Sequence, residues 1–189
     1  MKRNARFNEK TLTYSGKRDY LGMNLILFLS DIYLWVSGKM PQYTFSRIAK
    51  NDLHQIKPLW EKLNEIHRDD SVYFKEFYNT FTFDTRVKKF QETEDDLLFV
   101  YAARFESRPV GYCVATVSGK MGEIDSIFVE EGHRGNGIGG RLLQDSLAWM
   151  KRHDAARMFV SVVYGHESAF PFYQKYGFAP RLTFLEMKE

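Results

Sequence analysis

The stretch that decides the fold is IFVEEGHRGNGIGGRLL, which spans residues 127–143. Three apolar residues typical of a strand precede the glycines, and leucines at helical spacing follow them. Gly135, Gly137 and Gly139 let the backbone bend without Cβ clashes and expose successive N–H groups. The start of the following helix adds a partial positive charge. The pattern therefore predicts a strand, a turn and a helix start that together cradle an anion, above all a phosphate or pyrophosphate.

Two other nucleotide-binding motifs fit this loop less well. Gly135, Gly137 and Gly140 match the spacing G-x-G-x-x-G of dinucleotide-binding domains. However, only 49 residues follow Gly140, and the next strand ends without an acidic residue at the expected distance of about 20 residues. The triphosphate motif G-x-x-x-x-G-K-[ST] is also missing from the sequence. An ordinary glycine-rich turn is the remaining alternative, although a turn needs only one or two glycines.

Outward from this loop, the periodicity of apolar residues predicts further strands and helices. The expected strands are residues 43–48, 97–105, 110–118, 123–129, 157–164 and 181–187. The expected helices are residues 51–67, 72–90, 138–153 and 168–176. Residues 106–109 are expected to form a hairpin turn. This order implies an α+β fold in which helices pack on a mixed sheet.

Two motifs within this order of elements resemble those of one superfamily. Residues 134–139, RGNGIG, are similar to the R-G-x-G-I-G pyrophosphate loop of the GNAT superfamily of acetyl-CoA-dependent N-acetyltransferases. Residues 169–178, AFPFYQKYGF, resemble the superfamily signature A-x-x-x-Y-x-K-x-G-F. The resemblance covers residues 43–189 and implies the GNAT fold. In that α/β fold a central, mostly antiparallel sheet has splayed strands and carries helices on both faces.

The resemblance also implies acetyl-CoA as the cosubstrate, with no metal. Its pantetheine arm is expected to pair with backbone groups of Ile127, Phe128 and Val129, as an added strand pairs with a sheet edge. Its pyrophosphate is expected to contact Arg134, Gly135, Asn136, Gly137, Ile138, Gly139 and Gly140. His166 stands where many members carry an asparagine that contacts the cofactor. That contact is open for His166, and an exposed loop residue is the favoured alternative.

Amine acetylation needs a base for the ammonium group and a proton donor for the departing thiolate. The resemblance assigns the donor role, next to the cofactor, to Tyr173, with a core aromatic residue as the alternative. Glu123 and Asp125 lie two residues apart on the strand that enters the loop, so both should face one side of the sheet. Either carboxylate is a candidate base, and the resemblance favours Glu123, because its distance from the loop is similar to that of the superfamily's strand-borne glutamate. Solvated strand residues are the alternative.

A run of aromatic residues lies in the region that roofs the acceptor pocket in this superfamily. It consists of Tyr73, Phe74, Phe77, Tyr78 and Phe81. Their helical spacing favours ordinary core packing. Rings that face the pocket instead would suit an amine with an apolar or aromatic body.

Charge and cysteine content limit the other classes of partner. The net charge of +3 comes from residues 1–20, which hold six basic and two acidic side chains, so residues 21–189 have a net charge of −1. They lack the basic excess of a nucleic-acid-binding protein. The single cysteine, Cys113, cannot form an internal disulfide, so a reducing, cytoplasmic location is expected.

The first 39 residues lie outside the resemblance. Residues 21–36 are mostly apolar but are interrupted by Asn24, Ser30 and Asp31, so no stable membrane insertion is expected. A signal peptide is the less favoured alternative, because Asp31 lies within the apolar stretch. We expect residues 1–39 to be an N-terminal extension, disordered or an overlong start, and residues 40–189 to be an acetyltransferase domain.

The expected function is transfer of an acetyl group from acetyl-CoA to a primary amine of a small molecule or peptide by direct attack. Two alternatives stay open: a GNAT fold that binds CoA as a sensor or scaffold without turnover, and acetylation of a protein N-terminus or lysine. Neither the acceptor nor the oligomeric state can be predicted from the sequence, and a homodimer is one option.

Overall fold

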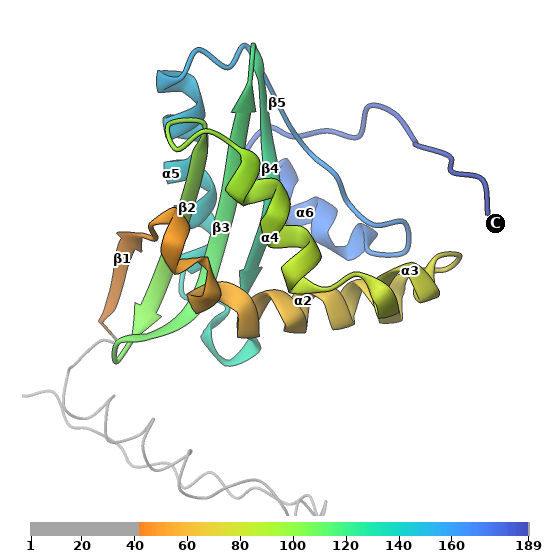
Figure 1. Ribbon diagram of the computed structural model, residues 1–189, viewed down its shortest axis with the longest axis horizontal. Helices are drawn as coiled ribbons and strands as arrows, with labels where there is room; N and C mark the ends of the chain where they lie inside the picture. The colour runs from red at the N-terminus through yellow and green to blue at the C-terminus, as the bar shows by residue number, and fades with distance from the viewer. Residues whose placement is uncertain (1–41, 189) are drawn as a thin grey trace, which may run out of the picture. The chain divides into compact units, whose positions relative to one another are not determined.

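The computed structural model describes residues 42–188, which form a five-stranded sheet with helices on both faces (Figure 1). The strands are β1 (Tyr43–Arg47), β2 (Leu98–Phe105), β3 (Arg108–Ser118), β4 (Met121–Val129) and β5 (Arg157–Val160). The α-helices are α2 (Lys57–Asp70), α3 (Lys75–Thr80), α4 (Phe83–Glu92), α5 (Ile138–Arg152) and α6 (Phe170–Gln174). Short 3₁₀ helices are η1 (Lys50–Ile56), η2 (Glu131–His133) and η3 (Glu167–Ala169). The predicted extension, residues 1–39, lies outside the described residues.

The sheet has the order β1-β2-β3-β4-β5, with antiparallel pairing up to β4 and parallel pairing between β4 and β5. This confirms the mostly antiparallel sheet that the resemblance implied. β5 pairs with β4 only as far as Ile124, whereas β4 continues to Val129. The two strands therefore separate beyond Ile124, and one edge of β4 stays open.

A bulge in β4 changes the face on which its side chains lie. The register between β3 and β4 shifts around Asp125, which has no partner residue on β3. An extra residue of this kind interrupts the alternation of side chains. As a result, Asp125 and Ser126 both face α2 and α4: Asp125 binds Arg86 of α4, and Ser126 binds Tyr112 in the core beneath these helices.

Two apolar clusters hold the helices to the sheet. In Figure 1, α2 and α4 lie across one face of the sheet and α5 lies behind it. The first cluster joins η1, α2 and α4 to the sheet and includes Trp60 and Phe90. The second joins α5 and α6 to the opposite face and includes Leu143, Trp149 and Tyr173. Because both faces are covered, backbone groups of the described sheet are accessible only at its edges, one of which is the open part of β4.

The helices differ from the expectation at two breaks. The helix expected over residues 51–67 starts as η1, and α2 begins at Lys57 with Pro58 in its first turn, where a missing N–H costs nothing. The helix expected over residues 72–90 is divided into α3 and α4. Thr82 caps α4 by accepting a hydrogen bond from the Thr85 amide at 3.2 Å, and such a cap starts a new helix.

Two predictions about apolar residues were wrong. Core packing was expected for the whole aromatic run, but Tyr73 and Phe77 are 56% and 51% exposed. Tyr73 precedes α3, and Phe77 lies on α3, a six-residue helix with no buried residue. A strand was expected over residues 181–187, but this segment forms no strand, and Phe184 is 80% exposed. Alternation indicates a strand only where a partner strand is available. Within residues 42–188, every helix is too short or insufficiently apolar to cross a membrane.

Candidate functional site

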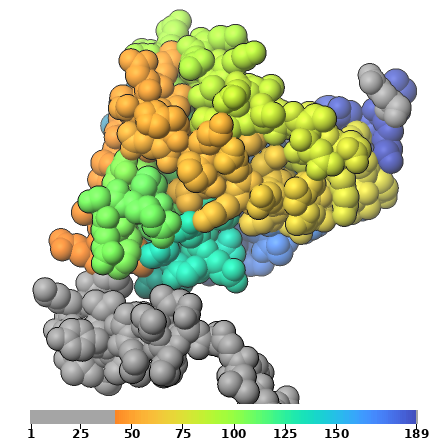
Figure 2. Space-filling model, turned by 60° about the horizontal axis from the view of Figure 1, so that its bottom comes forward, coloured from red at the N-terminus to blue at the C-terminus, as the bar shows by residue number. Residues whose placement is uncertain are grey.

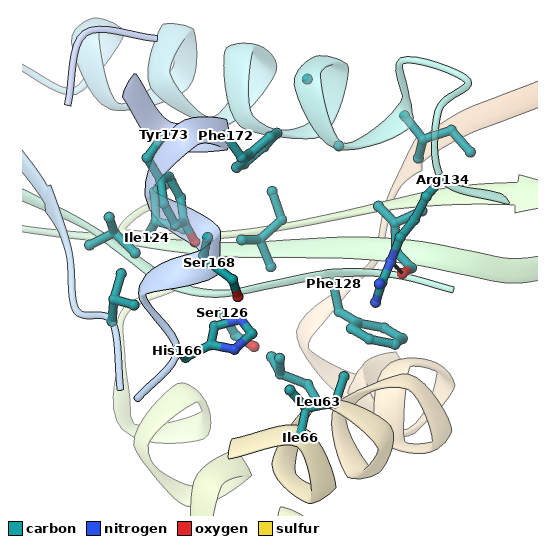
Figure 3. A pocket seen from close by; sticks show the side chains of 18 of the residues that line it. Leu63, Ile66, Ile124, Ser126, Phe128, Arg134, His166, Ser168, Phe172 and Tyr173 are labelled. Atoms are coloured by element: carbon teal, nitrogen blue, oxygen red, sulfur yellow. Dashed lines mark hydrogen bonds between the residues drawn. The ribbon is translucent and has the colours of Figure 1, made fainter. Parts of the chain in front are cut away.

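A cleft of about 670 Å³ opens where β4 and β5 separate. Its walls are the open edge of β4, the glycine-rich loop, α2 and the segment that leads from β5 into α6 (Figure 3). Of the predicted site residues, all line this cleft except Asn136 and Glu123. The cleft therefore brings the predicted cofactor-binding residues together with Tyr173, Asp125 and His166.

The open edge of β4 presents backbone groups to the cleft. The Glu130 amide donates to the Val110 carbonyl of β3 at 2.9 Å. Because antiparallel strands alternate between paired and outward-facing groups, the Phe128 backbone also faces β3, while Ile127 and Val129 face the cleft. Phe128 instead contributes its ring to the cleft wall. This edge can pair with the amides of an extended ligand.

Arg134 lies beside the end of this edge. Its Nε donates to the Val129 carbonyl at 2.9 Å, and its guanidinium lies 5.7 Å from the centre of the Phe128 ring. Figure 3 shows the side chain extending from the loop toward Phe128. The Val129 carbonyl is thus already occupied, and Arg134 holds a positive charge next to the loop.

The loop has the conformation that its glycines permit. Gly135 and Gly137 have φ angles of +80° and +75°, in the left-handed region that side chains disfavour. A Cβ on either glycine would meet no atom within 4 Å, so the space above the loop is open. The Asn136 amide folds back to donate to the carbonyls of His133 and Arg134 at 3.2 and 3.3 Å. The open space above the loop is therefore bordered mainly by backbone groups and not by the Asn136 side chain.

Three backbone amides at the start of α5 have no hydrogen-bond acceptor within the helix. Arg141 is the first residue whose amide donates in the helical pattern, to the Gly137 carbonyl at 3.0 Å. The preceding amides, of Ile138, Gly139 and Gly140, have no acceptor in the helix, and no side chain caps it. Figure 2 shows the loop at the surface between the β2–β3 turn and α2. These donors at the positive end of a helix can bind an anion that arrives from solvent.

Gly140 packs closely against Tyr176, in addition to its predicted contact with the pyrophosphate. A Cβ at Gly140 would lie 2.1 Å from the Tyr176 hydroxyl. A Cβ at Gly139 would lie 3.4 Å from the Phe172 ring, an ordinary contact. Gly140 therefore permits the close approach of α5 to Tyr176.

Glu130 anchors the loop, and the sequence analysis missed it. Its carboxylate accepts hydrogen bonds from Lys62 of α2 and from Arg108 at 2.7 Å. Burial alone would raise the pKa of Glu130, but these two cationic partners outweigh it and lower the pKa below its usual value. The partners are 68 and 22 residues away in sequence, so no local pattern could have revealed them.

Tyr173 belongs to the core and also reaches the cleft. The residue is 9% exposed, and its ring packs against Phe172 and Phe178 with centroid distances of 5.1 and 5.8 Å. Its hydroxyl has no hydrogen-bond partner among residues 42–188, and in that region no side-chain oxygen is both fully buried and unpartnered. The hydroxyl is therefore open to the cleft. Burial raises the pKa of Tyr173 above its usual value, so the phenol is protonated at neutral pH.

The two strand carboxylates share partners on α4. Lys89 binds both Asp125 and Glu123, the latter at 3.3 Å, so both side chains lie on one face of the sheet. The Asp125 side chain is fully buried and also accepts hydrogen bonds from Arg86 at 3.1 Å and Thr116 at 2.6 Å. Glu123 does not line the cleft. Both carboxylates are thus engaged in ion pairs.

His166 is not the exposed loop residue that the sequence analysis favoured. Its side chain is 24% exposed, lines the cleft and binds the Asp70 carboxylate at the end of α2 through Nδ1. The neighbouring ring of His67 lies 5.8 Å away, centroid to centroid. Burial lowers the pKa of His67 to about 4. Sequence analysis missed His67 and Asp70, because Asp70 is 96 residues from its partner.

The residues of the cleft fit acetyl-CoA. An open strand edge suits the amides of the pantetheine arm, and an uncapped helix start with left-handed glycines suits a pyrophosphate. Among residues 42–188, no group of three or more histidine, cysteine or acidic side chains is arranged to hold a metal ion.

Known proteins share this sequence pattern and fold. Residues 60–178 match the model of the acetyltransferase (GNAT) family. Uncharacterized N-acetyltransferase YobR of Bacillus subtilis (strain 168) is 36% identical over 67 residues, which are 35% of this chain and 27% of that relative's length. The chain thus matches only about a quarter of this curated relative.

Two solved structures illustrate the fold. The PaiA N-acetyltransferase of Thermoplasma acidophilum in complex with coenzyme A has a TM-score of 0.63 and 16% identity, covering 75% of this chain and 92% of its own. The aminoglycoside N-acetyltransferase AAC(6')-Iy in complex with CoA has a TM-score of 0.61 and 16% identity, covering 80% of this chain and 97% of its own. At these identities the likeness shows the fold alone.

Proposed function

The chain belongs to the acetyltransferase (GNAT) family, and from this membership we propose that it transfers an acetyl group from acetyl-CoA to a primary amine by direct attack. The amine belongs to a small molecule or a peptide. The solved neighbours with similar folds include an aminoglycoside acetyltransferase, so an amine acceptor is consistent with the family.

The observation that carries the proposal is the position of the open β4 edge next to the uncapped start of α5. The edge offers the outward backbone groups of Ile127 and the Val129 amide to an extended arm of amides, since Arg134 occupies the Val129 carbonyl. The loop and α5 offer amides to a pyrophosphate at one end of the same cleft. A ligand that combines both chemistries is CoA, and its acyl end then lies toward Tyr173.

In the proposed reaction Tyr173 is the general acid. The amine nitrogen attacks the thioester carbonyl, and the carbon–sulfur bond breaks as the tetrahedral intermediate collapses. The departing sulfur accepts the Tyr173 hydroxyl proton, since this phenol is protonated at neutral pH and opens into the cleft. The strand carboxylates Glu123 and Asp125 remain candidates for the base, but both are engaged by Lys89.

A thiol-release assay tests the proposal. The full chain is incubated with acetyl-CoA and a panel of polyamines, aminoglycosides, amino acids and peptides, and free CoA is measured with a thiol reagent. We expect release above the rate without amine for at least one member, together with a mass gain of one acetyl group on that amine. Acetyl-CoA binding without release on any amine would support the sensor alternative. Activity confined to peptides would support protein acetylation.

A further inference from the structure

The cleft contains a second candidate for the base besides the strand carboxylates. Asp125 is fully buried and has three cationic or hydroxyl donors, while Glu123 lies outside the cleft. An acceptor ammonium would have to displace Lys89 from either one. The base must have a free lone pair within reach of the cleft, and the His166 ring lines the cleft.

Asp70 fixes the orientation and the tautomer of His166. A carboxylate only accepts hydrogen bonds, so the Nδ1 that binds Asp70 carries a proton. In the neutral ring Nε2 is then the unprotonated nitrogen, with its lone pair free. No partner of Nε2 is found among residues 42–188, and the His166 ring lines the cleft. Figure 3 shows the ring near Ser126 and Ser168, on the side of the cleft toward Leu63.

The surroundings of His166 keep the ring available as a base. Titratable or charged groups near it include His67, Asp70, Arg86, Asp125 and Glu167. His67 is neutral at physiological pH, since burial lowers its pKa to about 4. Arg86 is bound to the Asp125 carboxylate and carbonyl. Asp70 is thus the charged group in direct contact with the ring.

We propose that His166 is the base that removes the proton from the acceptor ammonium, and that Asp70 is the positioning residue that holds its ring. This inference rests on the proposed acetyl transfer. The acceptor would enter past Leu63 and Ile66 of α2, which line the same part of the cleft.

The protons and electrons of the step balance. The ammonium gives one proton to Nε2 of neutral His166, and the resulting amine lone pair forms the new carbon–nitrogen bond. The electron pair of the carbonyl moves to its oxygen and returns as the carbon–sulfur bond breaks. The sulfur takes the Tyr173 proton, and the second proton of the new amide nitrogen restores the phenol through solvent. His166 then releases its proton to solvent, so each turnover yields amide, CoA thiol and one proton.

The pH profile of His166→Asn tests the base. For the wild-type chain with an amine selected by the panel, we expect kcat/KM to fall with a slope of one on the acidic side, as the ring becomes protonated. His166→Asn should lose about 10²- to 10⁴-fold in kcat/KM together with this acidic limb, while acetyl-CoA affinity measured by calorimetry stays unchanged. His54→Asn, which alters an exposed histidine on η1, is the matched control and should behave as wild type.

Asp70→Asn tests the positioning role. Loss of the carboxylate removes a charge that favours the protonated ring, so the acidic limb should move to lower pH while the rate falls. A merely structural role would change the rate without moving the limb. Long-range ¹H–¹⁵N spectra of the wild-type chain should show the His166 proton on Nδ1, and a proton on Nε2 would overturn the proposal.

The outcomes distinguish failure of the proposed acetyl transfer from failure of the base assignment alone. If the wild-type chain acetylates no amine, the proposed function fails, and the base fails with it. If the wild-type chain acetylates an amine and His166→Asn keeps both its rate and its acidic limb, only the base assignment is overturned. Loss of the limb in Glu123→Gln instead would return the role to the strand carboxylate.

Discussion

At Gly137 the open backbone of the loop leads to a test of cofactor binding. A Cβ there would project into space that no protein atom fills, and this is the space proposed for the pyrophosphate. We therefore expect Gly137→Ala to weaken acetyl-CoA binding at least about tenfold, since an added methyl blocks the close approach of a phosphate to backbone amides. Isothermal calorimetry measures the change.

Gly119→Ala is the matched control for the strain of this substitution. Gly119, in the β3–β4 turn, also has a positive φ, +56°, and open space around its Cβ position. Both variants should lose similar stability, about 1 kcal/mol, but Gly119→Ala should keep wild-type affinity. Equal affinities in the two variants would remove the pyrophosphate from this loop.

The Tyr173 hydroxyl is needed for the proposed catalytic role, whereas packing needs only the ring. Tyr173→Phe keeps the ring that packs against Phe172 and Phe178 and removes only the hydroxyl that opens into the cleft. We expect kcat to fall by about 10²- to 10⁴-fold with acetyl-CoA affinity little changed, as for a positioned proton donor. Steady-state kinetics with a reactive amine, under conditions where chemistry limits turnover, give the measurement.

Tyr101→Phe provides the comparison for the loss of a phenol. Tyr101 is partly buried against the same core cluster but does not line the cleft. Its variant should keep wild-type kcat. A wild-type kcat for Tyr173→Phe as well would assign Tyr173 to packing alone.

At the scale of elements, the bulge in β4 joins the sheet to α4. It brings Ser126 to the face on which Asp125 already lies, and there Arg86 and Lys89 of α4 hold the Asp125 carboxylate, which has no exposed surface. Removing the charge from one member of such a buried network leaves its partners poorly satisfied. We expect Asp125→Asn to lower the free energy of unfolding by about 1–3 kcal/mol, measured by urea denaturation at neutral pH.

Asp95→Asn serves as the control for an exposed ion pair. Asp95 binds Lys50 at 3.0 Å, but its side chain is 84% exposed, so solvent screens the interaction and little stability should be lost. Equal unfolding midpoints for the two variants would contradict a structural role for the buried network.

The elements show which features of the fold can be predicted from local sequence. The glycines from 135 to 140 and the helical leucines after them predicted β4, the loop and α5, because backbone conformation and amphipathicity are local properties. The bulge at Asp125 was not predicted, since it depends on the register with β3. The exposed side chains of Tyr73 and Phe77 have the same helical spacing as buried ones, and only the tertiary packing of this region distinguishes them.

At the scale of the whole molecule, the cleft combines residues that are far apart in the chain. His166 reaches it from the segment before α6, and Asp70 reaches it from α2, 96 residues earlier. The sequence motifs predicted the glycine-rich loop, because consecutive residues build it, and the structure places this loop at one end of the cleft. The rest of the cleft, including the side proposed for the acceptor, is built from α2, β4 and the segment before α6, and such long-range contacts leave no pattern in one sequence.

The contacts within residues 42–188 lead to a prediction about the domain boundary. Residues 42–188 form two core clusters, a five-stranded sheet and a cleft, and an acetyltransferase fold aligns over 97% of its own length with 80% of this chain. We therefore predict that a chain that begins at Met40 folds and binds acetyl-CoA with the affinity of the full chain. Its melting temperature should lie within a few degrees of the full-length value, which corresponds to about 1 kcal/mol or less. Calorimetry and thermal unfolding of the two chains, prepared in parallel, make the comparison. An insoluble short chain, or a melting temperature lower by about 10 °C or more, would mean that the apolar residues 21–36 contribute to the core and that the domain boundary lies before them.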